Sequence, residues 1–192
     1  MRKSSPAESL IFLLRHGQIQ GSEKKRFLGR TDVHLDQTGI HQALYWKKAF
    51  SSVRVETIYS SSLERCAHTA GVIANGKHIT TVPALNEINM GEWDGKSFDD
   101  IKQSLPREFE TRGRMIDQFR PPRGESFQDL QERVWPFFET LKKKQAGHIL
   151  VVTHAGVIRV MMCGIMGLHL KEMFKVKLVY GQLFILSFPI PK

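Results

Sequence analysis

The sequence predicts an α/β fold in which helices cover both faces of a mostly parallel sheet, and three observations lead to this prediction. Short apolar runs with strand character alternate along the chain with longer segments of helical periodicity. Such alternation favours parallel strands joined by crossover helices. With 192 residues, 41% of them apolar, the chain is also long enough to fill the core of one domain.

The predicted strands are short apolar runs, and the first follows a leader over residues 1–9 that we expect to be disordered. The sequences LIFLL and ILVV are the clearest runs, because they contain no polar side chain. In chain order, the expected strands cover residues 10–14, 57–59, 79–82, 149–152 and 184–188.

The predicted helices have apolar residues at helical spacing, and local signals mark where three of them begin. Asp36 is a typical N-cap for the first helix, and serines at positions 60–62 precede the second. Ser126 followed by Asp129 is close to a capping box for the third. In chain order, the expected helices cover residues 36–50, 63–73, 126–144 and the segment after His154 to about Met166.

Composition limits the partners that we expect. The chain has 28 lysines and arginines and 19 acidic residues, which gives a net charge of +9. Such a charge attracts anions, but it does not distinguish nucleic acids from small phosphates. No interleaved aromatic platform or zinc-finger spacing accompanies the basic residues, so we expect no nucleic-acid partner. No stretch approaches the ~20 apolar residues of a membrane span. Cys66 and Cys163 lie far apart, which fits a reducing compartment. We therefore expect a cytoplasmic protein without a membrane partner, and for its oligomeric state both a monomer and a homodimer stay open.

Residues with related chemistry follow three of the predicted strands. Arg15, His16 and Gly17 follow the first, Arg65 lies just beyond the second, and His154 follows the fourth. Ligands of open α/β sheets bind beyond the carboxyl ends of the strands, so we expect these residues to converge. Guanidinium groups match the geometry of phosphate oxygens, and imidazole is nucleophilic near neutral pH. The sequence thus predicts a phosphate site in which one imidazole attacks phosphorus and the other stays protonated beside its oxygens.

Such a reaction also requires an acid for the departing alkoxide. Glu87, Glu92 and Asp94 follow the expected strand at 79–82 and are the candidates. A carboxyl group that is shielded at this edge of the sheet could have its pKa raised toward the working pH. Position along the chain leaves all three open.

Five segments also occur in a characteristic order. They are residues 15–17 (RHG), the pattern RxxGxxDxxLxxxG over 26–39, residues 62–70 (SLERCAHTA), residues 85–95 (LNEINMGEWDG) and residues 152–157 (VTHAGV). Together they resemble the signature blocks of the histidine phosphatase superfamily, also called the phosphoglycerate mutase-like family, over nearly the whole chain. The resemblance implies one domain over residues 10–192, a three-layer α/β/α sandwich whose mostly parallel sheet has an antiparallel edge strand.

The resemblance further implies phosphomonoester hydrolysis in two displacements, with neither a metal nor another cofactor. His16 would be the nucleophile that forms a phosphohistidine. Glu87, rather than Glu92, would be the acid and then the base for water. The residues expected to bind the phosphoryl group are Arg15, Arg65, His154, Gly17, Ser22, Gly29 and Ala155.

Some positions carry their own expectations. Gln18 and Ile19 stand where the family usually has Glu-Thr, and Ser22 stands where an Asn often helps to hold phosphate. Gly17 is expected to let the chain turn tightly so that phosphate can approach. Among the remaining histidines, His68 is expected to lie nearest the site.

The expected substrate is a small anionic phosphorylated metabolite. The block GESF at 124–127, followed by Arg133 and Val134, resembles alpha-ribazole phosphatases, which makes alpha-ribazole 5′-phosphate a candidate. A cofactor-dependent phosphoglycerate-type mutase is an alternative, although mutases of this family are usually longer than this chain. A phosphate-binding module without turnover is another.

The basic segment 112–123 has two interpretations. It is either a solvated loop or a flap over the pocket that selects the non-reacting part of the substrate. In the second case, Arg114 and Arg120 would contact that part.

Overall fold

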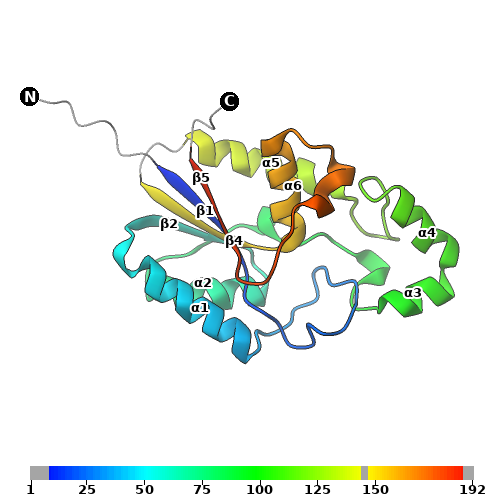
Figure 1. Cartoon of the computed structure of the whole chain (residues 1–192), viewed down its shortest axis with the longest axis horizontal. Helices are drawn as coiled ribbons and strands as arrows, with labels where there is room; N and C mark the ends of the chain where they lie inside the picture. The colour runs from blue at the N-terminus through cyan, green and yellow to red at the C-terminus, as the bar shows by residue number, and fades with distance from the viewer. Residues whose placement is uncertain (1–8, 144–146, 188–192) are drawn as a thin grey trace, which may run out of the picture.

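The computed structural model describes residues 9–143 and 147–187 (Figure 1). Five strands form one sheet in the order β3-β2-β4-β1-β5. Their bounds are β1 Leu10–Arg15, β2 Val55–Ser60, β3 Thr80–Thr81, β4 His148–Thr153 and β5 Leu183–Ser187. β5 pairs antiparallel with β1, and the other pairs are parallel. The mostly parallel sheet with an antiparallel edge strand is therefore confirmed. Except for Ser9, the predicted leader lies outside the described residues.

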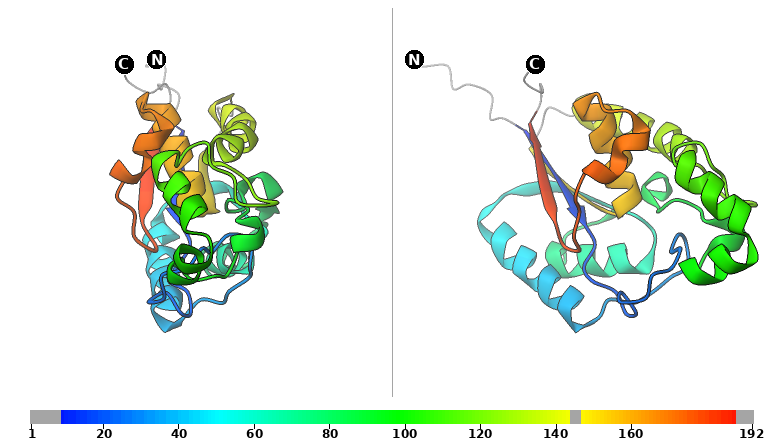
Figure 2. Two further views of the ribbon diagram at one scale, coloured as in Figure 1. Left: turned by 90° about the vertical axis from the view of Figure 1, so that its right-hand side faces the viewer. Right: turned by 45° about the vertical axis from the view of Figure 1, so that its right-hand side comes forward.

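Strand alternation divides the core between the two faces of the sheet. On β1, Ile11 and Leu13 belong to one buried cluster, whereas Phe12 and Leu14 belong to the other. The first cluster includes residues of α5, Phe127–Lys143, and α6, Ala155–Met166. The second includes residues of α2, Glu64–Ala74, against which α1, Gln37–Ala49, packs. The helices thus form the two outer layers of the predicted sandwich (Figures 1 and 2).

Two of the predicted helix starts are confirmed in atomic detail. The Oδ1 atom of Asp36 accepts a hydrogen bond from the backbone N–H of Gly39 at 2.8 Å. Ser126 and Asp129 form a reciprocal capping box, with bonds of 3.1 and 2.8 Å between each side chain and the other's backbone N–H. These caps satisfy N–H groups that a helix leaves without partners.

The second predicted helix begins differently. Leu63 is its N-cap and contributes no side-chain bond. The backbone N–H of Glu64 instead donates to the Oδ1 of Asp32, at 2.8 Å, from the segment after β1. Ser61 and Ser62 bind the side chain of Asn86. A residue distant in sequence therefore caps this helix, which is why the local serine pattern misled.

Two short helices were not predicted. They are α3, Phe98–Ser104, and α4, Pro106–Arg114, and they lie to one side of the sheet in Figures 1 and 2. Ser97 and Asp100 form a capping box at the start of α3, and Pro106 occupies the first turn of α4. Those sequence signals would have revealed both helices. Within the described ranges, no helix is both long and apolar enough to cross a membrane.

Candidate active site

A cavity of about 240 Å³ opens where the carboxyl ends of β1 and β4 meet the start of α2. Five of the predicted site residues line it, namely Arg15, His16, Arg65, Glu87 and Ala155. The convergence expected from the strand ends is therefore present in the structure. The remaining predicted residues lie behind the wall or elsewhere, as described below.

His16 is buried at the inner end of this cavity, with 4% of its surface exposed. Its backbone N–H donates to the carbonyl of Thr153, at 3.0 Å, across the β1–β4 edge. Its Nδ1 lies 2.8 Å from the carbonyl oxygen of Gly17, which can only accept, so Nδ1 carries the proton. The lone pair consequently resides on Nε2. Burial, followed by the positive charges of Arg65 and Arg15, holds the pKa of His16 well below its usual range. The ring is therefore neutral, as a nucleophile must be.

Gly17 is required by packing. A Cβ at this position would collide with the backbone of Gly39 in the first turn of α1. Its backbone φ is not in the left-handed region, and its N–H donates to Thr69 Oγ1 at 3.1 Å. The structure thus gives a packing reason for the glycine, which allows α1 to approach β1, and the expected tight turn that admits phosphate stays a prediction. Gly17 does not line the cavity.

Arg15 is held by the segment that precedes β5. One of its terminal nitrogens donates to the carbonyl of Leu178 at 3.2 Å, and its guanidinium lies 3.8 Å from the ring centre of Tyr180. Its Nε is buried and has no hydrogen-bond partner within residues 9–143 and 147–187. Burial lowers the pKa of this guanidinium. An unsatisfied donor at the wall of a cavity is suited to an anion.

Arg65 is oriented by three hydrogen bonds and is 1% exposed. Its terminal nitrogens donate to the carbonyls of Gly29, at 2.7 Å, and Thr31, at 2.9 Å. Its Nε donates to Nδ1 of His154 at 3.2 Å. All three acceptors are neutral, so the positive charge of Arg65 is oriented without being neutralised.

Gly29 acts through Arg65. Its carbonyl accepts from Arg65, and a Cβ on this glycine would overlap the carbonyl oxygen of Ile88. Asp94 holds the same segment in place, because its carboxylate accepts from the backbone N–H groups of Gly29, Arg30 and Thr31 at 2.8 to 2.9 Å. Asp94 is thus committed to the loop. Gly29 does not line the cavity, in contrast to its predicted contact with phosphate.

His154 is fully buried behind Arg65, and its ring centre lies 5.2 Å from that of His16. Because its Nδ1 accepts from Arg65, its Nε2 carries the proton and donates to Ser61 Oγ at 2.7 Å. Ser61 donates in turn to Asn86 Oδ1 at 2.8 Å. Burial and then the charge of Arg65 hold the pKa of His154 well below its usual range. In the ligand-free protein this ring is neutral, whereas the sequence pattern suggested a protonated one.

Cys66 lies against the same imidazole, with Sγ 3.3 Å from Nε2 of His154. Burial, chiefly, raises the pKa of this thiol, so it stays protonated. Within the described ranges, no group of three or more His, Cys, Asp or Glu side chains is arranged to hold a metal ion.

Of the three candidate acids, Glu87 alone lines the cavity. Its two carboxylate oxygens accept from the backbone N–H groups of Ile88, at 2.9 Å, and Gly156, at 3.1 Å. Gly156 is in the first turn of α6, so Glu87 also interacts with the positive end of that helix dipole. Glu92 is half-exposed and pairs with Arg123 at 3.0 Å. The structure therefore supports the choice of Glu87.

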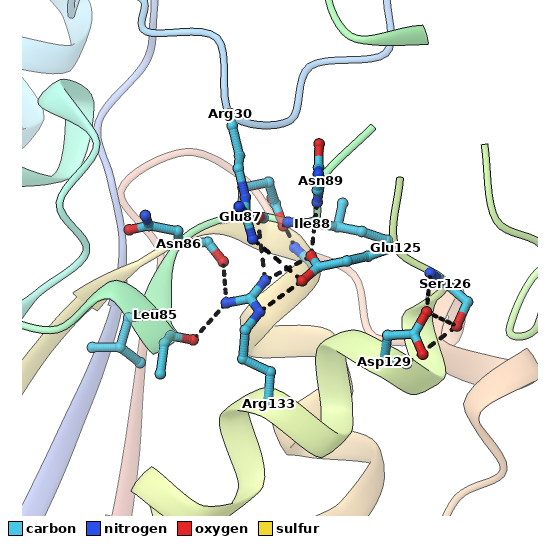
Figure 3. Close-up of polar contacts among 12 residues, drawn as sticks. Arg30, Leu85, Asn86, Glu87, Ile88, Asn89, Glu125, Ser126, Asp129 and Arg133 are labelled. Atoms are coloured by element: carbon cyan, nitrogen blue, oxygen red, sulfur yellow. Dashed lines mark hydrogen bonds and ion pairs between the residues drawn. The ribbon is translucent and has the colours of Figure 1, made fainter. Parts of the chain in front are cut away.

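Arg133 and Glu125 fix the loop that carries Glu87 (Figure 3). Arg133, on α5, donates to the carbonyls of Ala84, at 2.8 Å, and Asn86, at 3.1 Å, and pairs with Glu125 at 2.9 Å. Glu125 also accepts from the N–H of Asn89 at 2.9 Å. Burial opposes ionisation of Glu125, but the bonds from Arg133 and Asn89 outweigh it and lower its pKa. The block at 124–127 therefore has a positioning role.

Several predicted residues lie away from the cavity. Ser22 lies in a turn, where its backbone N–H donates to the carbonyl of Ile19, and it does not line the cavity. His68 is on the exposed face of α2, while the neighbouring Thr69 supports Gly17. Their positions depend on how distant segments pack, which spacing along the chain does not encode.

The basic segment 112–123 contributes one residue to the cavity. Arg112, near the end of α4, lines it. Arg114 pairs with Glu110 on the outer face of α4, and Arg120 pairs with Asp129. The flap hypothesis thus named the wrong two arginines. Arg26, Arg159 and Tyr180 also line the cavity, and sequence reasoning did not identify them as site residues.

Comparison with known proteins agrees with this geometry. The family model of the histidine phosphatase superfamily (branch 1) matches residues 11–189. Adenosylcobalamin/alpha-ribazole phosphatase of Escherichia coli is 27% identical and aligns over 89% of this chain and 86% of its own length. A 2,3-bisphosphoglycerate-dependent phosphoglycerate mutase of Bartonella henselae is also 27% identical, over 94% and 93%. The crystal structure of alpha-ribazole phosphatase from Shigella flexneri has a TM-score of 0.85 and 26% identity, and the match covers 92% of this chain and 89% of that one. The chain therefore belongs to the histidine phosphatase superfamily.

Proposed function

We propose that the protein hydrolyses small phosphomonoesters through a phosphohistidine at His16, without a metal ion. One observation carries the proposal. His16 is neutral, its Nε2 is free of hydrogen-bond partners in the described part of the chain, and it lies beside two arginines that have no carboxylate within ion-pairing distance. A phosphoryl dianion matches such a cluster, because guanidinium groups donate in pairs to its oxygens.

In the first step, Arg15 and Arg65 bind the phosphoryl oxygens and Nε2 of His16 attacks phosphorus. The Nε2–P bond forms as the P–O bond to the leaving group breaks. The incoming dianion opposes the effect of the arginines on His154, so protonation of that ring becomes more favourable and it can stabilise the oxygens. Donors that are already oriented supply most of the stabilisation of such a transition state.

Glu87 supplies the proton movements on both sides of the intermediate. Its protonated form donates to the departing alkoxide, and the resulting carboxylate then accepts a proton from water as water attacks phosphorus and the Nε2–P bond breaks. The hydrogen bonds from Ile88 and Gly156 orient the carboxyl group for both steps. At the end of the cycle Glu87 is again protonated and His16 is again free.

Alpha-ribazole 5′-phosphate is a candidate substrate, supported by the relatives from Escherichia coli and Shigella flexneri. Phosphoglycerate mutase activity is the second candidate. The chain matches 93% of the Bartonella henselae mutase, so chain length does not separate the two reactions as the sequence suggested. The two differ in where the phosphoryl group goes, to water or back to a substrate.

The test is phosphate release from p-nitrophenyl phosphate in EDTA by the wild type, His16→Ala and the matched control His78→Ala, whose side chain is exposed. We expect the wild type and the control to turn over, and His16→Ala to lose at least about a thousandfold in kcat. Activity that EDTA abolishes, or that survives in His16→Ala, would reject the mechanism. Isomerisation of phosphoglycerate without phosphate release would establish the mutase instead. Tight phosphate binding with no turnover would indicate the binding module.

A further inference from the structure

The arginines of this protein fall into two groups. Within the described ranges, the cavity is lined by five arginines, and none of them forms an ion pair; they are Arg15, Arg26, Arg65, Arg112 and Arg159. Six of the seven other described arginines do form one: Arg30, Arg54, Arg114, Arg120, Arg123 and Arg133. Among the described arginines, those without an ion pair are thus concentrated in the cavity.

Two of these arginines lie on aromatic rings that also line the cavity. The guanidinium of Arg112 lies 5.0 Å from the ring centre of Phe27, and that of Arg159 lies 4.9 Å from the ring centre of Phe174. Phe27 stacks in turn on Phe98, with ring centres 4.3 Å apart. We call these five residues, together with Arg26, the outer wall of the cavity; all six line it.

Burial lowers the pKa of both Arg112 and Arg159. For Arg112 no carboxylate opposes this effect, and for Arg159 only the charge of Glu87 does. A half-buried cation without a partner is unfavourable in the free protein, because it has lost water without gaining an opposite charge. An anion that enters the cavity removes this cost.

The charges do not balance with a phosphoryl group alone. A phosphomonoester carries up to two negative charges, which Arg15 and Arg65 match. Glu87 is the one carboxylate among the described residues that line the cavity, and it faces five arginines. Arg26, Arg112 and Arg159 then share Glu87 alone, so at least two of their positive charges remain uncompensated when a simple ester is bound.

We propose that the leaving part of the natural substrate carries a second anionic group, a carboxylate or a phosphate, which Arg112 and Arg159 bind while its carbon skeleton lies against Phe27 and Phe98. This proposal rests on the phosphatase function proposed above and narrows its substrate class. An ester with an uncharged leaving group, such as the nucleoside of alpha-ribazole phosphate, leaves the outer wall without an opposite charge.

The test compares two esters of matched shape, 4-carboxyphenyl phosphate, which carries a second anion, and 4-carbamoylphenyl phosphate, which does not, with 1,4-phenylene bisphosphate as the phosphate form of the second anion. Each is assayed with the wild type, Arg112→Met and Arg114→Met. The methionine at 112 keeps an apolar stem over Phe27, and Arg114 is the control because it lies on the same helix, is exposed and pairs with Glu110. The ratio of kcat/KM between the charged and uncharged esters is the readout.

We expect the wild type to prefer a charged ester by at least about tenfold, which equals about 1.4 kcal/mol. Arg112→Met should lose most of that preference, and Arg114→Met should keep it. Whether the carboxylate or the second phosphate is preferred then identifies the anion. Equal rates for charged and uncharged esters in the wild type would overturn the proposal. An equal loss of preference in both variants would also overturn it, since the effect would then come from net charge.

A binding measurement separates this proposal from the proposed function. Calorimetry with the His16→Ala protein gives the ratio of Kd values for the carboxy and carbamoyl esters without turnover. If the wild type hydrolyses none of the esters but the variant binds the carboxy ester about tenfold more tightly, the phosphatase function fails and the second anion site stands. If the esters are hydrolysed but the variant binds them equally, the phosphatase function stands and the second anion site fails.

Discussion

In the inner end of the cavity, formed by Arg15, His16, Arg65 and Glu87, every side chain has a hydrogen bond to a backbone group, whereas in the outer wall Arg112 has none to the described residues and aromatic contacts are more frequent. His16 and Arg65 each bind a backbone carbonyl, and Glu87 binds two backbone N–H groups. Arg112 and Arg159 lie on phenylalanine rings, and of the two only Arg159 adds a bond to a backbone carbonyl, that of Val176 at 3.5 Å. Backbone partners fix both position and direction, while stacking fixes a plane and allows the guanidinium to slide. The difference indicates a rigid centre for chemistry beside a wall that can adapt to its ligand.

The largest expected effect tests the rigid part through Glu87→Gln. The amide keeps the shape but neither donates a proton to an alkoxide nor accepts one from water, so kcat for phenyl phosphate should fall by about 10² to 10⁴-fold. p-Nitrophenolate leaves without protonation, so with p-nitrophenyl phosphate we expect a burst equal to the enzyme concentration, followed by slow turnover. Rapid-quench kinetics measures both phases. If the first phosphoryl transfer slows equally with phenyl phosphate and with p-nitrophenyl phosphate, Glu87 acts by orientation alone.

Gly29→Ala tests whether backbone support of Arg65 matters as much as the arginine itself. The new Cβ would overlap the carbonyl of Ile88, so the segment that binds Arg65 must shift, at an overpacking cost of about 1–3 kcal/mol. We expect a lower Tm and a higher KM for every phosphate ester, charged or not.

Gly71→Ala is the matched control for this substitution. Gly71 lies within α2, and a Cβ there would meet nothing within 4 Å. Relative to glycine, alanine favours a helix interior by up to about 1 kcal/mol. Tm should therefore rise slightly while KM stays unchanged. A Gly29→Ala protein with wild-type KM would show that Arg65 does not depend on this loop.

A further prediction concerns pH. The folded pKa values of His16 and His154 are depressed, so the unfolded chain binds protons that the folded protein does not. Stability is then fully present above the unfolded value of about 6.5 and is lost as pH falls below it, by at most about 1.4 kcal/mol per pH unit for each ring. Thermal unfolding between pH 7.5 and 5 measures this slope, and His154→Gln should reduce it. Added phosphate should shallow the slope, because an anion favours the protonated rings. An unchanged slope in His154→Gln would contradict the assignment.

The inner end was largely predictable from sequence, and the outer wall was not. Arg15, His16 and His154 directly follow apolar strands, and parallel strand ends converge by topology. Arg159 lies five residues after His154, on a helix. The sequence around it does not show that this side of the helix faces the cavity. Arg112 depends on α4, which was missed although Ser97 and Pro106 signalled the helix pair.

The features of the site that sequence reasoning missed have a common physical origin. The neutral state of His154 depends on its burial and then on the charge of Arg65, and the requirement for Gly17 depends on Gly39; in each case segments far apart in the chain are brought together. Ser22 was likewise expected to contact phosphate because of its place in a motif, and that place does not determine where the residue lies in space. Patterns along a chain specify elements and their ends, while charge states and close approaches arise from packing.

The pairing of β1 also has a consequence for how the protein is made. Ile11 pairs with Ile149 on one side and with Leu186 on the other, so the strand that leads into His16 depends on two segments much farther along the chain. Until these segments are synthesised its apolar sequence has neither neighbour, and such long-range pairing slows folding and exposes nascent chains to aggregation. Pairing of β1 on both sides, and with it the placement of His16, therefore requires segments that are synthesised long after β1 itself.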